Sequence, residues 1–228
     1  MSRVLDVVRM HLLVRLTFVT LPLIILGGAF ALTLAIFALI PSDGIKIAGA
    51  GQAPLWYFLS VGVMAQTRTF PFSQAMSTTR REFFLGTMLT GLLASGALAA
   101  LFVVLGLIEK ATDGWGMNGR MYFIDDFGGG NVAVAFLAYL VIAMLAFTTG
   151  LTFATVYKRF KVLGLWAAIA GVVVALLLAI VAITKTSSWP AVGDFLIDAG
   201  PLGLAAIGVA VIAVVGLADY LVLRRTQP

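Results

Sequence analysis

Cysteine is absent from this chain of 228 residues, and histidine occurs once, as His11. Without cysteine there is no disulfide, no thiol nucleophile and no thiolate ligand for a metal. A single histidine also disfavours membrane metalloproteases and haem-binding bundles, which use several ligating side chains. A membrane enzyme is therefore a poor interpretation, and the sequence predicts no catalytic, cofactor-binding or metal-binding residue in this chain.

Charge is scarce as well, since charged residues make up 11% of the chain and hydrophobic residues 61%. The mean hydropathy is +1.09. Soluble domains carry about a quarter charged residues, so this composition indicates a protein of the lipid bilayer. The net charge of +5 does not require a nucleic-acid partner, because basic residues mark the cytoplasmic side of membrane proteins. We expect no nucleic-acid binding.

Six apolar segments approach or exceed the roughly 20 residues that a helix needs to cross a bilayer. The predicted spans lie near residues 16–40, 54–72, 84–108, 132–157, 162–183 and 202–223. The first is too long for the apolar part of a cleaved signal peptide and is expected to be retained. The sequence shows no repeat and no long linker. It predicts an all-α polytopic membrane protein with one transmembrane domain, residues 1–228.

The distribution of basic residues tests this arrangement, because Lys and Arg concentrate on the cytoplasmic side. With six spans and the amino terminus inside, 11 of the 15 basic residues fall on the inner side. If the polar-interrupted segment 54–72 did not cross, the side of the amino terminus would hold only 6, against 9 opposite. The sequence therefore predicts six transmembrane helices with both termini in the cytoplasm.

Residues 1–15 precede the first span and have an amphipathic pattern. Arg3, Asp6 and Arg9 recur every three residues, with apolar residues between them. This spacing predicts a helix that lies in the inner membrane interface. The alternative is a plain cytoplasmic extension of the first span. His11 is expected to be an ordinary residue of this helix.

Residues 73–83, which we call the inner elbow, join the second and third spans. Their arginines need do no more than fix the topology. Glu82, however, stands beside them where topology requires no acid, and Phe83 and Phe84 return the chain to the bilayer. Small and polar residues from Ser73 onward can start a helix. The pattern predicts a short, rigid, charged helix parallel to the membrane.

The stretch STTRREFFLGT, residues 77–87, resembles the serine/threonine–Arg–x–Glu–Phe–x–x–Gly sequence common in permease subunits of ABC exporters of the ABC-2 superfamily, which have the type V fold. It stands after the second span, where that family places it. The six-span layout, the amphipathic amino-terminal helix and the apolar piece 192–197 are also similar to that family, especially to short permeases of bacterial drug and antimicrobial-peptide exporters. The chain departs from the usual pattern at Thr87, where lysine is frequent.

The resemblance implies a permease of an ATP-driven exporter in the bacterial cytoplasmic membrane. Such permeases pair as two six-span halves, here expected as a homodimer, and bind two cytoplasmic ATPase subunits. The family's coupling helix, which docks on the ATPase, corresponds by position to residues 73–83. The coupling contacts expected from the resemblance are Ser77, Thr78, Thr79, Arg80, Arg81 and Glu82.

The chain does not carry the ATPase itself, because a phosphate-binding P-loop needs a Gly-Lys pair and none occurs. The resemblance therefore places ATP and Mg²⁺ on the partner chain, with no cofactor bound here. Transport direction rests on the resemblance alone, and no feature of the sequence selects a substrate.

Polar residues elsewhere have weaker interpretations. Gln66 and Arg68, near the inner end of the second span, are candidates for a translocation path, although an arginine there can also snorkel to the interface. Asp219 is expected to form a local ion pair with Arg224 or Arg225. In the outer loop 109–131, Asp125 and Asp126 are expected to be solvated, and Trp115, Tyr122, Phe123 and Phe127 to lie along the interface.

Two other classes of function stay open. An ion-gradient-driven carrier or a channel usually keeps acidic residues near the midplane of the bilayer. Here the acidic residues near the spans, Glu109 and Asp219, stand at their ends, which disfavours that class. A membrane scaffold or sensor that transports nothing is the other alternative, and nothing in the sequence excludes it.

Overall fold

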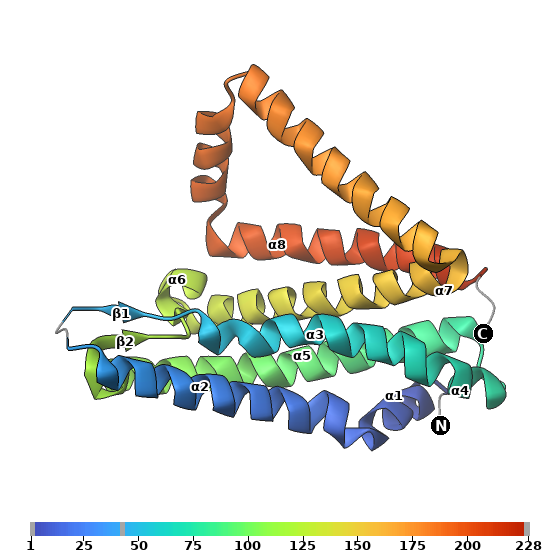
Figure 1. Ribbon diagram of the computed structural model, residues 1–228, viewed down its shortest axis with the longest axis horizontal. Helices are drawn as coiled ribbons and strands as arrows, with labels where there is room; N and C mark the ends of the chain where they lie inside the picture. Colours follow the sequence, from blue (N-terminus) through green and yellow to red (C-terminus); the bar gives the residue numbers. More distant parts are fainter. Residues whose placement is uncertain (1–2, 42–43, 226–228) are drawn as a thin grey trace.

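Almost every segment of the computed structural model is helical, over the described residues 3–41 and 44–225 (Figure 1). The α-helices are α1 (Arg3–Leu13), α2 (Leu21–Leu39), α3 (Ala53–Met64), α4 (Phe70–Ala75), α5 (Arg80–Ala111), α6 (Ile124–Gly128), α7 (Val132–Lys185) and α8 (Trp189–Leu223). Shorter helical turns are Leu16–Thr20, Ala50–Gln52, Ala65–Thr69 and Gly114–Asn118. Strands β1 (Lys46–Ile47) and β2 (Gly119–Arg120) form one parallel pair.

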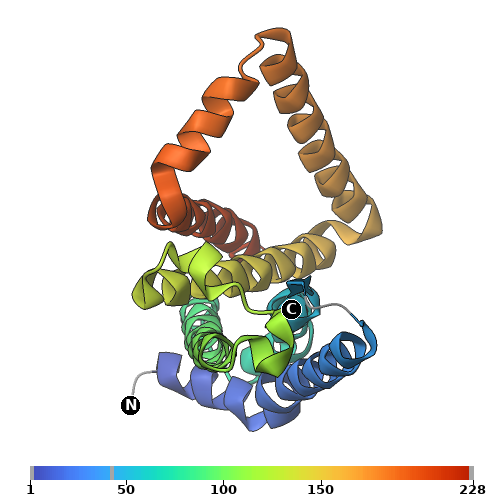
Figure 2. The same ribbon diagram turned by 90° about the vertical axis from the view of Figure 1, so that its left-hand side faces the viewer.

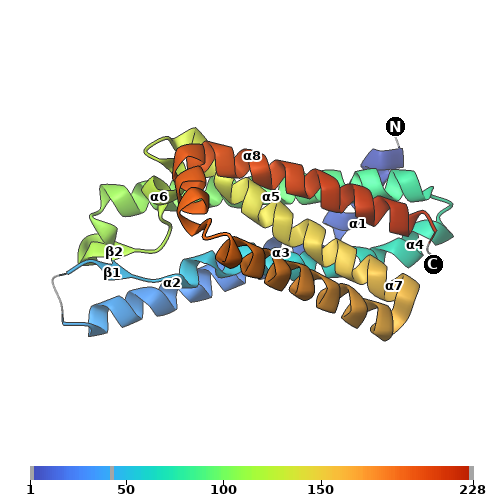
Figure 3. The same ribbon diagram turned by 90° about the horizontal axis from the view of Figure 1, so that it is seen from above.

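The two ends of the helical bundle differ in what they carry (Figure 1). One end holds the ends of the chain, α4 and the bend of α7, and we call it the inner end, after the orientation that the basic residues predict. The other, the outer end, holds the two strands and α6. Seen from above, α8 runs along the bundle from the outer end to the inner end (Figure 3).

Four helical stretches are long and apolar enough to cross a membrane, judged by length and composition. They are Leu16–Leu39, Arg80–Ala111, Val132–Lys185 and Trp189–Leu223. The predicted all-α class is therefore confirmed, and the helices are those of a membrane-embedded protein. The segment from α3 to α4 is continuous helix broken only by a π-helical turn, but it is not among the four. The six crossings and the cytoplasmic location of the termini stay predictions.

The long helix α7 is bent sharply at Lys161 (φ 60°, ψ −161°), which divides it into the arms 132–160 and 162–185. Each arm is long enough for one crossing, and the two arms correspond to the fourth and fifth predicted spans. The second arm swings away from the bundle (Figure 2). Its side chains, such as Leu163 and Leu178, are exposed. A helix that is apolar all round needs lipid or another protein around it.

The last helix, α8, is broken at Gly200 (φ 60°, ψ −177°), just before Pro201. Glycine adopts this positive φ without steric cost. The short piece before the break, 189–199, contains the mostly apolar segment 192–197, which is therefore helical. Whether this piece enters the outer leaflet stays a prediction.

Two helix backbones approach each other closely where α3 crosses the first arm of α7. A Cβ atom added to Gly62 would lie 2.8 Å from the backbone nitrogen of Leu151, so only glycine fits there. Gly150 faces the backbone of α3 in the same way. On α5, Gly91 makes room for the ring of Phe147. Small residues thus let the backbones approach, as in other membrane bundles.

At the outer end, the loop after α5 folds onto the bundle. Tyr122 is fully buried, and its ring lies 5.4 Å from that of Phe102. The hydroxyl of Tyr139 on α7 donates a hydrogen bond to the carbonyl of Tyr122. The prediction of an interfacial position is therefore wrong for Tyr122, because its ring is packed inside the protein against Phe102.

Candidate functional site

The inner elbow is a tight turn between two helices. Helix α4 ends at Ala75, and Ser77 adopts a left-handed conformation (φ 57°). Thr79 then caps α5: its hydroxyl oxygen accepts from the N–H of Glu82 at 3.2 Å, and the Glu82 carboxylate accepts from the N–H of Thr79 at 2.9 Å. The separate helix predicted within residues 73–83 is found only as the end of α4, residues 73–75, because a turn over residues 76–79 follows and the reciprocal cap starts α5 at Arg80.

Two other segments of the chain contact the elbow at the inner end, and a third is bonded to one of them. A guanidinium nitrogen of Arg3, on α1, lies 4.0 Å from the carboxylate of Glu82. The guanidinium of Arg80 donates to the carbonyl of Arg224, just after α8. Beside it, Arg159 of α7 donates to the carbonyl of Arg225 at 2.6 Å. Helices α1, α5, α7 and α8 are thus tied together at this end.

The residues predicted to contact an ATPase differ in whether their side chains already have partners within the chain. Thr79, Arg80 and Glu82 use their side chains within the chain, and the backbone of Thr78 bonds to that of Ser73 at 3.1 Å. Arg81 is exposed and makes no hydrogen bond or ion pair with the described residues. Ser77 is exposed as well. Arg81 is therefore the charged elbow residue that is free for a partner.

Helix α1 is packed against the start of α5, next to the elbow. Val7 sits on Gly86, where an added Cβ atom would lie 2.6 Å from the Cβ of Val7. Val7, Val8 and His11 are buried, whereas Leu12 and Leu13 are exposed on the other side. The predicted amphipathic helix is confirmed for residues 3–13, and residues 1 and 2 lie outside the described part. Its position in the membrane interface stays a prediction.

His11 is part of this contact, which the sequence alone did not predict. It is fully buried, and its Nε2 atom lies 3.0 Å from the hydroxyl oxygen of Thr87 on α5. Its ring stands edge-on to that of Phe18 at 5.4 Å. Burial lowers the pKa of His11 to about 4, so the ring is neutral at physiological pH. The spacing of four residues from Val7 is the sequence signal that places it on the buried face.

Gln66 and Arg68, the candidates for a translocation path, are separated by the structure. Both belong to the π-helical turn Ala65–Thr69 between α3 and α4. Gln66 is fully buried, with both amide atoms unpartnered among the described residues, whereas Arg68 is exposed. π-helical turns often accompany functional positions. Only Gln66 faces the interior of the bundle.

Asp219 has a different environment from the one predicted. Its side chain is 1% exposed, and neither carboxylate oxygen has a hydrogen-bond partner among the described residues. It makes no ion pair with Arg224 or Arg225. Those arginines lie beyond the end of α8, and Arg224 and Arg225 use their carbonyls for Arg80 and Arg159. The predicted ion pair is therefore wrong, since Asp219 points into the bundle.

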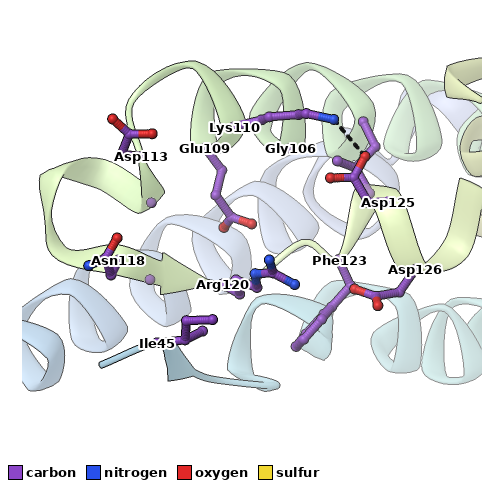
Figure 4. Close-up of a pocket in the computed structure, with 13 residues that line it drawn as sticks. Ile45, Gly106, Glu109, Lys110, Asp113, Asn118, Arg120, Phe123, Asp125 and Asp126 are labelled. Carbon is purple, nitrogen blue, oxygen red and sulfur yellow. Dashed lines mark hydrogen bonds and ion pairs between the residues drawn. The ribbon is translucent and has the colours of Figure 1, made fainter. Parts of the chain in front are cut away.

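The outer end holds a cavity of about 330 Å³ (Figure 4). Glu109 lies inside it and accepts from the backbone N–H of Met121 at 2.8 Å and from the indole of Trp115 at 3.4 Å. Lys110 pairs with Asp125 at 2.8 Å. Within the described residues, no group of His, Cys, Asp and Glu side chains has the arrangement of a metal site. Glu109 thus holds the outer loop in place.

A second cavity, of about 470 Å³, lies between the first arm of α7 and α8. Its walls are apolar, from residues such as Val141, Leu145 and Leu204, with Asp126 at its edge. A cavity of this size and polarity suits a small apolar ligand or part of a lipid chain. Gln66 and Arg68 do not line it.

Comparison of the chain with models of known protein families, with curated proteins and with solved structures found no match.

Proposed function

We propose that this chain is the transmembrane permease subunit of an ATP-binding cassette exporter, driven by a separate ATPase that docks on the inner elbow. The proposal rests on the resemblance of residues 77–87 to ABC-2 permeases. The observation that supports it best is the inner end, where Arg81 stands exposed in the first turn of a long helix, without a hydrogen bond or ion pair to the described residues, and where α1 and the end of α8 are tied to that turn.

The position of the elbow suits it to transmit a mechanical force from a docked ATPase to α5. Helix α5 has 32 residues, so it is a rod of about 48 Å, enough to cross the hydrocarbon layer. The reciprocal cap of Thr79 and Glu82 stiffens its first turn. Because α1 is packed on Gly86, a force on the elbow moves α1 and α5 together. Such rigid-body motion is the usual way in which soluble domains drive membrane segments.

The permease acts as a homodimer in this proposal, with two ATPase subunits. The second arm of α7 is exposed along its whole length, although its residues are almost all apolar. Lipid or a second copy covers this arm. Movement of the two halves toward and away from each other would open a central path to each side of the membrane in turn. The apolar cavity between α7 and α8 is consistent with a hydrophobic substrate.

Affinity purification of the chain from its native membranes in mild detergent tests the proposal. We expect an ATPase with Walker motifs to purify with the wild-type chain. Arg81→Glu should remove that ATPase without changing insertion, because the Arg81 side chain is exposed and makes no hydrogen bond or ion pair with the described part of the chain. Arg81→Lys keeps the charge and should retain it.

Glu82→Gln provides the matched control for the elbow. It alters the neighbouring residue and weakens the cap of α5, but leaves Arg81 in place. If Glu82→Gln and Arg81→Glu reduced ATPase recovery equally, the effect would come from the fold of the elbow and not from a contact of Arg81. A wild-type chain that purifies without any ATPase would contradict the proposed function.

An ion-coupled carrier is the second candidate, favoured by the buried, unpaired carboxyl of Asp219. The sequence disfavoured this class because Asp219 stands near the end of its span, but the structure buries it. The two candidates are separated by purified chain in lipid vesicles: an ion gradient drives uptake or release by a carrier without any ATPase, whereas the permease alone is inactive.

A further inference from the structure

The inner part of the bundle contains buried polar groups that the proposed docking of an ATPase does not use. Asp219 on α8, Gln66 before α4 and Lys158 on α7 each have a buried polar atom without a hydrogen-bond partner among the described residues. An unpaired polar group costs free energy in a low-dielectric interior. The coincidence of three such groups on three neighbouring helices therefore requires a physical cause.

These groups lie close to one another in depth. Phe70 and Leu223 belong to one buried cluster, and the ammonium of Lys158 lies 4.9 Å from the centre of the Phe70 ring. Gln66 precedes Phe70 by four residues, and Asp219 precedes Leu223 by four. One helical turn farther from the inner end, Gln66 and Asp219 therefore stand at a similar level. Lys158, whose ammonium lies over the Phe70 ring, stands about one helical turn nearer the inner end than Gln66 and Asp219.

The immediate neighbour of Asp219 restricts its charge state. Its carboxyl lies against the hydroxyl of Thr155 on α7, although without the geometry of a hydrogen bond. The Thr155 hydroxyl donates its own hydrogen to the carbonyl of Leu151 at 3.0 Å. The oxygen of Thr155 can then only accept, so an ionised Asp219 would meet a second acceptor. A protonated carboxyl, in contrast, can donate to that oxygen.

The other charged and titratable groups near Asp219 do not neutralise it. From α5, Arg80 is bonded to the carbonyl of Arg224, and Phe84 rather than a charge faces Tyr220. From α1, His11 is neutral and is bonded to Thr87. On α7, Lys158 lies over the Phe70 ring and forms no ion pair with Asp219.

We propose that Asp219 is a proton-binding site: its carboxyl holds one proton while α8 is packed on α7, and gives it up to water at the inner end when the two helices separate. The step is the reversible addition of one proton to a carboxylate. In the ionised state, Lys158, about one turn nearer the inner end, is the available counter-charge. The proposal does not depend on an ATPase partner, and it holds for either candidate function.

A hydrophobic carbodiimide tests the proposal, because it reacts with protonated carboxyls in apolar surroundings. The purified full-length chain in lipid vesicles is treated at about pH 6.5, where exposed carboxyls are ionised. Glu109 is an internal comparison, since it is also buried but its carboxylate already accepts N–H groups of Met121 and Trp115, whereas that of Asp219 has no hydrogen-bond partner among the described residues. We expect Asp219 to react at least about tenfold faster than Glu109 and the reaction to fade as the pH rises.

Two variants and a comparison of sodium with choline complete the carbodiimide experiment. Asp219→Asn imitates the neutral carboxyl, so it should keep the thermal stability of the wild type, and Lys158→Met should leave the carbodiimide reaction unchanged. An unreactive Asp219, or a large loss of stability in both variants, would show an ionised Asp219 paired with Lys158 and overturn the proposal. Protection of Asp219 by sodium but not by choline at constant pH would overturn it in favour of a sodium site.

Discussion

The contact of His11 with α5 predicts that α1 comes loose from the bundle at low pH. In the packed state burial lowers the pKa of His11 from 6.5 to about 4, whereas a released α1 returns it to its ordinary value. The released state therefore binds more protons between these two values. Packing of α1 is fully stable above about pH 6.5, weakens as the pH falls, and has lost all of this contribution below about pH 4.

The size of the effect follows from the two pKa values. Between about pH 8 and pH 5, the free energy that holds α1 in place should fall by about 2 kcal/mol, which is about a 30-fold increase in the released fraction. The full difference of about 3 kcal/mol is reached below pH 4. The physical cause is the burial of the ring, which disfavours its charged form; a second N–H, at Nδ1, would also have no acceptor among the described residues.

Hydrogen exchange of the α1 backbone measures this release directly, after correction for the intrinsic effect of pH on exchange. Protection of the α1 amides should fall about 30-fold between pH 8 and pH 5, while that of the α3 amides stays constant. His11→Gln keeps a polar partner for Thr87 but does not titrate, so its α1 protection should not depend on pH. A wild-type chain whose α1 protection is equally independent of pH would refute a neutral, buried His11.

Further predictions concern the caps and close contacts. Thr79→Ala removes the cap of α5 and should lower stability by about 1 kcal/mol, measured as thermal unfolding in detergent; an unchanged midpoint would argue against the cap. Glu109→Ala should free the outer loop, so that trypsin cuts after the exposed Arg120 faster than in the wild type. Gly150→Leu should prevent the α3–α7 crossing and yield misfolded protein, whereas Gly171→Leu, where the added side chain meets open space, should fold.

The helices of the bundle could be predicted from the sequence, because an apolar run of about 20 residues is stable as a helix in a bilayer and in few other environments. The breaks at Lys161 and Gly200 lie within two residues of the starts of the predicted fifth and sixth spans. The start of α5 was also predictable. Thr79 and Glu82 have the spacing of a capping box, a local signal that takes precedence over a separate helix in the elbow.

The environments of individual polar residues could not be predicted from the sequence, because they depend on contacts between distant segments. Asp219 has two arginines close in sequence, which suggested a local pair, but its carboxyl lies against Thr155 of α7. Glu109 is held by N–H groups of a loop that no sequence pattern positions. His11 was an intermediate case, since its helical face was predictable while its partner Thr87, 76 residues away, was not.

The proposed function depends most on what the inner elbow touches in the cell membrane. The absence of native cysteine makes a single Arg81→Cys variant, carrying a photo-activated cross-linker, a specific probe of that contact. Lys185→Cys, exposed at the end of the second arm of α7, is the control. We expect an ATPase with Walker motifs to cross-link from position 81 and not from position 185. Recovery of that ATPase from neither position, or from position 185 alone, would contradict the proposed docking on the inner elbow.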